Sequence, residues 1–294
     1  AYRYLRIVTF FMLQSVIVYF SLAHFMIVCG WIAAKRERNY LKYSHNGPHY
    51  TLSFWHYETI WPLLLFALIF GCRYNVGVDY PHYLDNYLYG GNREYEFLFQ
   101  TVTSFLSSNG IHYAAFFTLW AFIEVFLLFY TFRKQRFLFP YIAFILIFGF
   151  YYLSMMNVIR QQIAACIFLY SLSYIERKQP QKYFLCVLLA FGFHKSAILL
   201  IPVYFLLRWK KDWFPNCFWQ WVFYAVALFL STRYDIVVNG VEQLFVTFAS
   251  LAGYDNYAVG ILTNETLNSA NQFGNNSGWG VYFSIWLTTP IIFL

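Results

Sequence analysis

The sequence predicts an all-α polytopic membrane protein, a bundle of about seven or more transmembrane helices with large loops on one face. The composition, the length of the apolar runs and the placement of the basic residues predict it. Of the 294 residues, 60% are apolar and 24% are aromatic, but only 11% are charged, whereas soluble chains average roughly 25% charged residues. Because no soluble-sized gap separates the apolar runs, we expect a single transmembrane domain over residues 1–294.

The same composition argues against several other classes of protein. The net charge of +7 does not indicate nucleic-acid binding, because the basic residues lie in short clusters between apolar runs, where membrane topology explains them. The five cysteines form no Cys-x-x-Cys pair, so neither a disulfide framework nor a zinc site is expected. The chain begins without Met and stops inside the apolar run 286–294, so we expect it to be part of a longer protein.

Seven apolar runs approach the length of about 20 residues that a helix needs to cross the hydrocarbon core. They cover residues 5–33, 54–71, 111–132, 137–153, 158–175 and 217–231, with a last run starting near residue 281.

Four clusters between these runs hold 13 of the 20 basic residues. They are Lys35/Arg36/Arg38/Lys42, Arg133/Lys134/Arg136, Arg177/Lys178/Lys182 and Arg208/Lys210/Lys211. The positive-inside rule makes these loops cytoplasmic and places residues 72–110, 154–157 and 232–279 on the outer face. Arg3 and Arg6 then also lie outside, against the rule.

The stretch 183–207 is long enough for one crossing, but a single crossing would place the Arg208 cluster on the outer face. His194, within the polar residues 192–196, divides it into two arms of 11 and 13 residues, each about half a bilayer long. We therefore expect a re-entrant hairpin or broken helix with His194 at its apex, with one kinked span as the alternative. Irregular backbone at membrane depth needs cover from protein or water, so a hydrated cavity should reach His194.

The predicted outer loop 72–110 is rich in charged and aromatic side chains. Among them are Arg73, Asp79, Tyr80, Tyr83 and Glu96. An interfacial aromatic belt accounts for most of the tyrosines, but it does not account for the carboxylates and the arginine, so a functional role is favoured. The apolar run 97–106 is too short to span and should lie at the interface.

Arg160 lies about one turn inside the predicted span 158–175. Its charge could snorkel to the headgroups, but Asn157 and Gln161 share its helical face and would form a polar stripe. An Arg fork suits bidentate phosphate contact, and ionisable residues inside a membrane are functional candidates.

Three further features of the sequence bear on function. Glu124 lies mid-span and must face the interior or water, as a proton-relay group or as a protonated hydrogen-bond donor. The Asn-rich segment 232–279 could bind carbohydrate or form ordinary loops. Neither a zinc motif, a nucleophile elbow nor a P-loop occurs, so a conventional hydrolase is not supported.

Four motifs occur in order over about residues 60–210. They are Arg73-x-x-x-Gly77-x-Asp79-Tyr80-x-x-Tyr83, Glu96-Phe97-Leu98-Phe99, Asn157-x-x-Arg160-Gln161 and Phe193-His194-x-Ser196. With this order and spacing, the chain resembles the EpsG family of bacterial polysaccharide polymerases, also described as Wzy-like. A Pro usually follows the acidic residue of the second motif, and Phe97 departs from that pattern, which puts the role of Glu96 in doubt.

The resemblance implies glycosyl transfer on the outer face of the bacterial inner membrane, within a GT-C-like helical fold. The expected substrates are oligosaccharide repeat units on undecaprenyl diphosphate, with a chain-length regulator protein as a further partner and with no metal or other cofactor.

The candidate residues fit this chemistry. Arg160 and Arg73 would hold the diphosphate by charge-assisted hydrogen bonds. The base is His194 or Asp79, and His194 is favoured because imidazole exchanges a proton near neutral pH; Asp79 would then orient it or bind sugar. The sugar-binding and supporting residues would be Asn157, Gln161, Glu96, Tyr80 and Tyr83.

Three rival functions remain open at this point. A flippase or transporter for the same lipid-linked sugars would need functional polar residues in the cytoplasmic half as well, where only Glu124 and Glu58 offer them. A ligase or acyltransferase with a lipid donor would use the same face, and a non-enzymatic scaffold would need neither Arg160 nor His194. The one-sided distribution of polar residues favours an outer-face enzyme.

Overall fold

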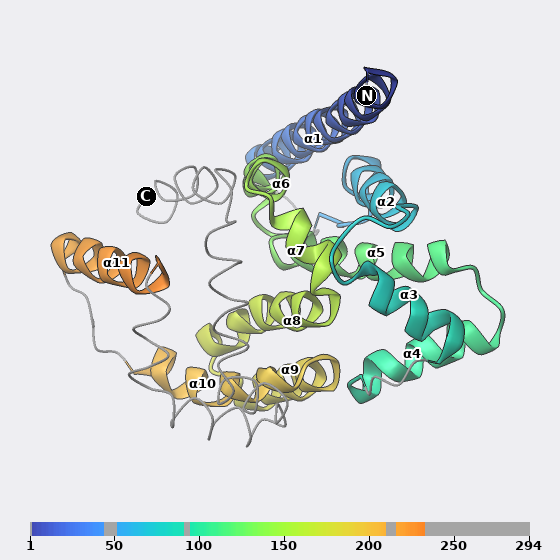
Figure 1. Cartoon of the computed structure of the whole chain (residues 1–294). Helices are drawn as coiled ribbons and strands as arrows, with labels where there is room; N and C mark the ends of the chain where they lie inside the picture. The colour runs from blue at the N-terminus through green and yellow to red at the C-terminus, as the bar shows by residue number, and fades with distance from the viewer. Residues whose placement is uncertain (1, 44–51, 91–94, 210–215, 233–294) are drawn as a thin grey trace. The chain divides into compact units, whose positions relative to one another are not determined.

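The computed structural model describes residues 2–43, 52–90, 95–209 and 216–232, which contain helices and no strand (Figure 1). The chain divides into two compact units, Ala1–Ala197 with Leu287–Leu294, and Ile198–Trp286. The first unit contains α1 (Tyr2–Tyr43), α2 (Tyr57–Gly71), α3 (Tyr80–Tyr89), α4 (Phe97–Ser108), α5 (Tyr113–Thr131), η2 (Arg136–Leu138), α6 (Phe139–Phe148), α7 (Tyr151–Asn157), α8 (Ile159–Glu176) and α9 (Pro180–Phe193). Then η3 (Lys195–Leu200) leads into the second unit, which contains α10 (Ile201–Arg208) and α11 (Cys217–Thr232).

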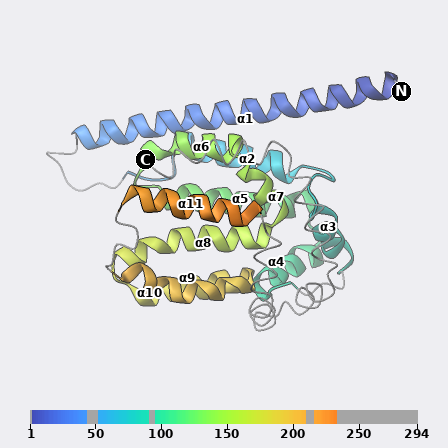
Figure 2. The ribbon, with the colours of Figure 1, turned by 60° about the vertical axis from the view of Figure 1, so that its left-hand side comes forward.

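α5 is the central helix of the first unit. α2 packs on α5, α8 packs on it as well, and α9 packs along α8. The short turn between α8 and α9 makes these two helices antiparallel, and Figure 2 shows them side by side. α1 covers α2 and α6.

The helix crossings depend on glycines that let backbones touch. A Cβ atom at Gly71 would lie 2.0 Å from Thr118 Oγ1 and 2.4 Å from Thr118 Cα, so α2 and α5 are in backbone contact there. A Cβ atom at Gly30 of α1 would lie 2.6 Å from the backbone nitrogen of Pro140 at the start of α6. Close approach through small residues is the usual way in which membrane helices associate.

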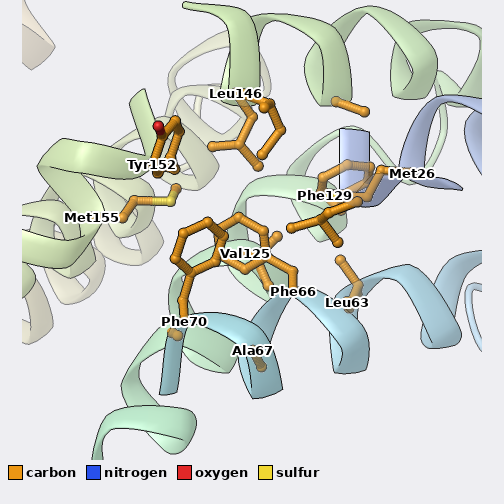
Figure 3. Close-up of a cluster of buried hydrophobic side chains, with 14 of the residues drawn as sticks. Met26, Leu63, Phe66, Ala67, Phe70, Val125, Phe129, Leu146, Tyr152 and Met155 are labelled. Carbon is orange, nitrogen blue, oxygen red and sulfur yellow. The ribbon is translucent and has the colours of Figure 1, made fainter. Parts of the chain in front are cut away.

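A continuous apolar core joins α1, α2, α5, α6 and α7 (Figure 3). Leu63 of α2 and Val125 of α5 are fully buried in it, and the rings of Phe66 and Phe70 pack with their centroids 4.4 Å apart. Because these side chains come from helices far apart in sequence, the core holds α2 and α5 as one rigid frame for the polar groups at their ends.

Basic residues of the predicted cytoplasmic loops meet at one end of this frame. Arg36 forms an ion pair with the buried Glu58, with 3.0 Å between Nη1 and Oε1. The buried Arg136 donates from Nη2 to the carbonyl oxygens of Ser53 (2.6 Å) and Leu52 (3.1 Å). The predicted outer residues lie at the opposite ends of α2, α8 and α9.

Two of the described helices contain segments long and apolar enough to cross a membrane, Val16–Lys42 and Tyr113–Thr131. A third candidate is the bent pair Arg136–Phe148 and Tyr151–Asn157, if it forms one span, while α2 and α9 are apolar but shorter. The prediction of seven or more spans therefore stays a prediction.

The expected span over residues 137–153 is bent, and whether it crosses the membrane as one span stays a prediction. α6 and α7 meet there at 67°, because Phe150 adopts a left-handed backbone conformation with a φ of 58°. A Cβ atom at position 149 would lie only 2.4 Å from the carbonyl oxygen of Ile145, which is too close for any side chain. Gly149 therefore permits the tight end of α6. The predicted outer loop 72–110 contains two helices, α3 and α4.

The predicted break at His194 is present. α9 ends at Phe193, His194 is extended with a φ of −154° and a ψ of 122°, and η3 begins at Lys195. The second unit begins at Ile198, so the return of the second arm, and with it the hairpin, stays a prediction. α11 coincides with the predicted span 217–231, whereas nearly all of the loop 232–279 and the last predicted span lie outside the described residues.

Candidate functional site

Glu96, Arg160 and His194 meet at one end of the first unit, from three segments far apart in sequence. One carboxylate oxygen of Glu96, Oε2, forms an ion pair with Arg160 Nη1. The other, Oε1, lies 3.2 Å from His194 Nδ1 and accepts a hydrogen bond of 3.2 Å from the backbone N–H of Lys195. We call these four residues, Glu96, Arg160, His194 and Lys195, the Glu96 cluster.

Helix ends position the members of the Glu96 cluster. Glu96 precedes α4, but its side chain caps no backbone N–H of that helix and reaches α8 and α9 instead. Arg160 is the second residue of α8, and His194 directly follows α9. Because α8 and α9 are antiparallel neighbours, the start of one and the end of the other lie together. A cation in the first turn of α8 opposes the helix dipole, and the Glu96 carboxylate offsets that cost.

The electrostatic surroundings keep Glu96 ionised. Burial by itself raises the pKa of this carboxyl, but the hydrogen bond with His194, the charge of Arg160 and the backbone N–H groups lower its pKa to about 2. The Glu96 carboxylate therefore carries a full negative charge at neutral pH, and it can hold both a cationic guanidinium and an imidazole N–H.

Two tyrosines flank the guanidinium of Arg160. Its central carbon lies 4.4 Å from the ring centroid of Tyr95, a distance typical of a cation–π contact. Tyr83 is buried beside it, and burial raises the pKa of Tyr83 to about 12, although the charge of Arg160 works in the opposite direction. Tyr83 is thus a neutral hydroxyl group at neutral pH.

Arg73 lies outside the Glu96 cluster. Its Nη1 donates to the carbonyl oxygen of Phe70 (2.9 Å) and its Nη2 to that of Met156 (2.8 Å). Both ends of the fork are thereby used to join the end of α2 to the end of α7. Its guanidinium also lies 5.1 Å from the ring centroid of Phe117.

The predicted polar stripe of Asn157, Arg160 and Gln161 is wrong, because the helix breaks between them. α7 ends at Asn157 and α8 begins at Ile159, with Val158 in a non-helical conformation. Asn157 turns to another segment: its Oδ1 accepts from the Val78 N–H (2.7 Å), and its Nδ2 donates to the carbonyl oxygen of Leu153 (2.9 Å).

The close approach of this loop to Asn157 requires a glycine. Gly77 has a φ of 111°, and a Cβ atom there would lie 2.7 Å from Asn157 Oδ1. Only glycine combines that backbone conformation with so little room, so Gly77 allows the outer loop to attach to α7 through the Val78 N–H.

The remaining predicted site residues lie around the Glu96 cluster. Asp79 is half-buried at the start of α3 and contributes electrostatically to the surroundings of Tyr83. Tyr80 is buried and stacks on Phe117 with ring centroids 4.6 Å apart. Gln161 is exposed on α8. The carboxylate next to His194 is that of Glu96, so of the two roles predicted for Asp79, orienting His194 or binding sugar, the first falls to Glu96.

Sequence reasoning missed two residues of this site, Tyr95 and Lys195. Each directly adjoins a residue that was singled out, Glu96 in one case and His194 in the other, and that adjacency was the available signal. Lys195 is exposed, and its ammonium group makes no ion pair with any residue that the structure describes.

Comparison with known proteins identifies the family. A family model described as the EpsG family matches residues 59–276, well over half of the 294 residues. The matched range contains all four sequence motifs and every member of the Glu96 cluster. No curated protein and no solved structure matches the chain. This membrane protein therefore belongs to the EpsG family, which confirms the resemblance found in its motifs and indicates a function like that of the polysaccharide polymerases.

Proposed function

We propose that the protein is a glycosyltransferase that polymerises oligosaccharide repeat units carried on undecaprenyl diphosphate. It would act on the outer face of the bacterial inner membrane. The observation that supports this proposal is the Glu96 cluster, in which an arginine fork and an oriented imidazole are held by one carboxylate at the end of a helical bundle.

In the proposed reaction, a hydroxyl oxygen of the acceptor repeat unit attacks the anomeric carbon of the growing chain. The bond from that carbon to the diphosphate oxygen breaks, and the electron pair leaves with undecaprenyl diphosphate. The hydroxyl proton passes to His194. No oxidant or other co-reactant is needed, because one glycosidic bond forms as one glycosyl–phosphate bond breaks.

The contact with Glu96 prepares His194 for the role of base. The 3.2 Å contact between Nδ1 and Oε1 of Glu96 favours the neutral tautomer that carries its proton on Nδ1, which leaves the lone pair on Nε2. Nε2 is then the atom that accepts the hydroxyl proton. Asp79, at the start of α3, is the second candidate for the base. The polymerisation rates of variants at the two positions distinguish the candidates, because loss of the base should lower the rate more.

Arg160 is the group we assign to the diphosphate. Its planar fork matches phosphate oxygens, and negative charge grows on the leaving diphosphate as the bond breaks. Lys195 takes the place that the sequence assigned to Arg73, because both terminal nitrogens of Arg73 are engaged with backbone carbonyls.

The structure weakens one argument for the flippase alternative. That alternative relied on Glu58 and Glu124 as functional polar groups in the cytoplasmic half, but Glu58 is buried in an ion pair with Arg36. At the other end of the unit, Glu96, Arg160, His194 and Lys195 come together from three segments, and this gathering supports a one-sided transferase.

The decisive experiment supplies the purified protein with a defined lipid-linked repeat unit and separates the products by length. We expect a ladder of polymers with the wild type and with Arg177→Ala, an exposed arginine at the far end of α8. Arg160→Ala and His194→Ala should produce no ladder while they remain folded. Wild-type protein that makes no ladder but moves the lipid between leaflets would establish the flippase instead.

A further inference from the structure

An apolar groove of about 440 Å³ lies between α4 and α9, next to the Glu96 cluster. Its walls are Phe97 and Leu98 from α4 and the row Leu185, Leu188, Leu189 and Phe191 from α9. Leu185 and Leu188 are each 66% exposed and Phe97 is 76% exposed. The volume falls within the range of about 300–1,000 Å³ typical of small-molecule sites.

The groove is polar at one end only. Glu96, Gly192 and Lys195 line that end, and two of them belong to the Glu96 cluster. Lys195 and Arg160 place two cations there against the single carboxylate of Glu96. A ligand that follows the groove into the cluster must therefore be an amphiphile with an apolar chain and an anionic head.

Gly192 brings the two walls together at that end. A Cβ atom at this position would lie 2.5 Å from Leu98 Cδ1 and 2.7 Å from its Cγ, so α4 and α9 are in direct contact below the cluster. Because Glu96 and Lys195 line the groove and also belong to the Glu96 cluster, the groove adjoins the proposed reaction centre.

We propose that this groove binds the first isoprene units of the polyprenyl carrier and delivers the diphosphate to Lys195 and Arg160. This inference rests on the proposed function, because it assigns a place to the lipid part of the substrate. The row of leucines on α9 would shield the apolar isoprene chain from the surrounding phospholipid. Lys195 and Arg160, at the polar end of the groove, would favour a diphosphate head group, because it carries more negative charge than the phosphodiester of an ordinary phospholipid.

Binding of radiolabelled farnesyl diphosphate to the protein in phosphatidylcholine nanodiscs tests this assignment, with inorganic diphosphate as the second probe. Leu188→Trp fills the groove with a larger apolar side chain, and Leu68→Trp makes the same change on the exposed face of α2. We expect Leu188→Trp to weaken farnesyl diphosphate binding by about tenfold or more, because each CH₂ removed from apolar burial costs a factor of about four in affinity. Leu68→Trp should bind like the wild type, and inorganic diphosphate should bind equally to all three proteins.

Leu189→Phe is a smaller change in the same groove and serves in case Leu188→Trp does not fold. It should also weaken farnesyl diphosphate binding. The assignment is overturned if both groove variants bind farnesyl diphosphate like the wild type. It is also overturned if phosphatidylglycerol displaces the probe at the same concentration, because the groove would then accept ordinary membrane lipid. Failure of the proposed function would be visible separately, as wild-type protein that binds the probe normally and yet forms no polymer ladder.

Discussion

Glu96 is the residue whose importance the sequence understated. Its role was in doubt because Phe97 replaces the Pro that usually follows the acidic residue of this motif. In the structure, Phe97 is 76% exposed and turned into the groove, whereas the Glu96 carboxylate contacts Arg160, His194 and the Lys195 N–H. The presence of Phe97 in place of the usual Pro therefore leaves the contacts of the Glu96 carboxylate intact.

Replacing Glu96 by Gln should lower the polymerisation rate by about 10- to 100-fold, less than the 10²–10⁴-fold expected for loss of the base itself. The amide keeps the shape of the side chain but loses the charge that pairs with Arg160 and orients His194. Glu96→Asp should restore part of the rate, which a purely structural role would not predict. The exposed Asp85→Asn on α3 is the matched control, and a Glu96→Gln rate equal to that of the control would remove Glu96 from the mechanism.

The same carboxylate makes folding stability depend on pH in acid. Because the pKa of Glu96 is lowered to about 2 in the folded protein, its contribution is fully present above the ordinary pKa of a carboxyl group, about 4.3, and is lost as the pH falls towards 2. At pH 6 we expect Glu96→Gln to melt about 2–8 °C below the wild type. In detergent-solubilised protein this difference should shrink steadily between pH 4.5 and 2.5; a constant difference would contradict the pKa assignment.

Arg160→Lys separates charge from geometry. Lysine keeps the positive charge but loses the planar fork and the stacking on Tyr95. We expect the polymerisation rate to fall by at least about tenfold, the size of effect that follows when one charge-assisted hydrogen bond worth about 1.5 kcal/mol is lost. Arg177→Lys provides the comparison at an exposed site, and equal activity of the two variants would show that any cation suffices at position 160.

The sequence identified most of the residue types of this site but not their partners. Arg73 and Asn157 have the chemistry to bind substrate, yet both form hydrogen bonds with backbone groups instead. Arg73 donates to the carbonyl oxygen of Met156 and Asn157 accepts from the N–H of Val78, in each case about 80 positions away along the chain. No local pattern shows which distant carbonyl or N–H will satisfy a polar side chain. Only the packing of α7 against the outer loop decides it.

At the scale of elements, apolar run length predicted most helices well. The expected spans 54–71, 111–132 and 158–175 appear as α2, α5 and α8, because each is bounded by polar residues. The bend between α6 and α7 was not predicted, since the run 137–153 is apolar throughout and the deciding feature is the left-handed backbone of Phe150 after Gly149. The helix α3 was also missed, because its aromatic and polar residues do not form an apolar run, whereas the short apolar run 97–106 appears as α4.

The contact between α2 and α5 yields a prediction at this scale. Gly71→Ala would place a methyl group 2.4 Å from Thr118 Cα, so the two helices must separate, at a cost of about 1–3 kcal/mol. Thermal unfolding in detergent should show the loss. The double variant Gly71→Ala/Thr118→Ala should remain destabilised, because the clash is with backbone; full recovery on removal of the threonine side chain would contradict the proposed backbone contact.

At the scale of the whole molecule, the polar groups divide between two ends of the first unit. Cys72 is exposed at the end of α2 that leads to Arg73, and Lys178 lies at the opposite end, after α8. In cells, a membrane-impermeant maleimide should label Cys72 from outside in a Cys217→Ser background. A cysteine placed at Lys178 should react only after the membrane is made permeable. Labelling of both positions from the same side would contradict the topology.

The expected hairpin after His194 has its own test in the same assay. A cysteine at Arg208 should react from the cytoplasm if the second arm returns, and from outside if residues 183–207 form one crossing. Cys72 is the outer reference in both cases. Reaction of residue 208 from outside would replace the hairpin with a single kinked span and leave the Glu96 cluster unchanged.

The order of the three segments along the chain has a consequence for biogenesis. The ribosome delivers Glu96 first and Arg160 next, and the break after α9 arrives only about 35 residues later. A nascent chain inserted as far as α8 can already close the ion pair between Glu96 and Arg160, yet it lacks the imidazole and the second wall of the groove. The proposed site is therefore completed only when α9 and His194 are inserted, and we expect chains arrested before that point to bind no lipid carrier.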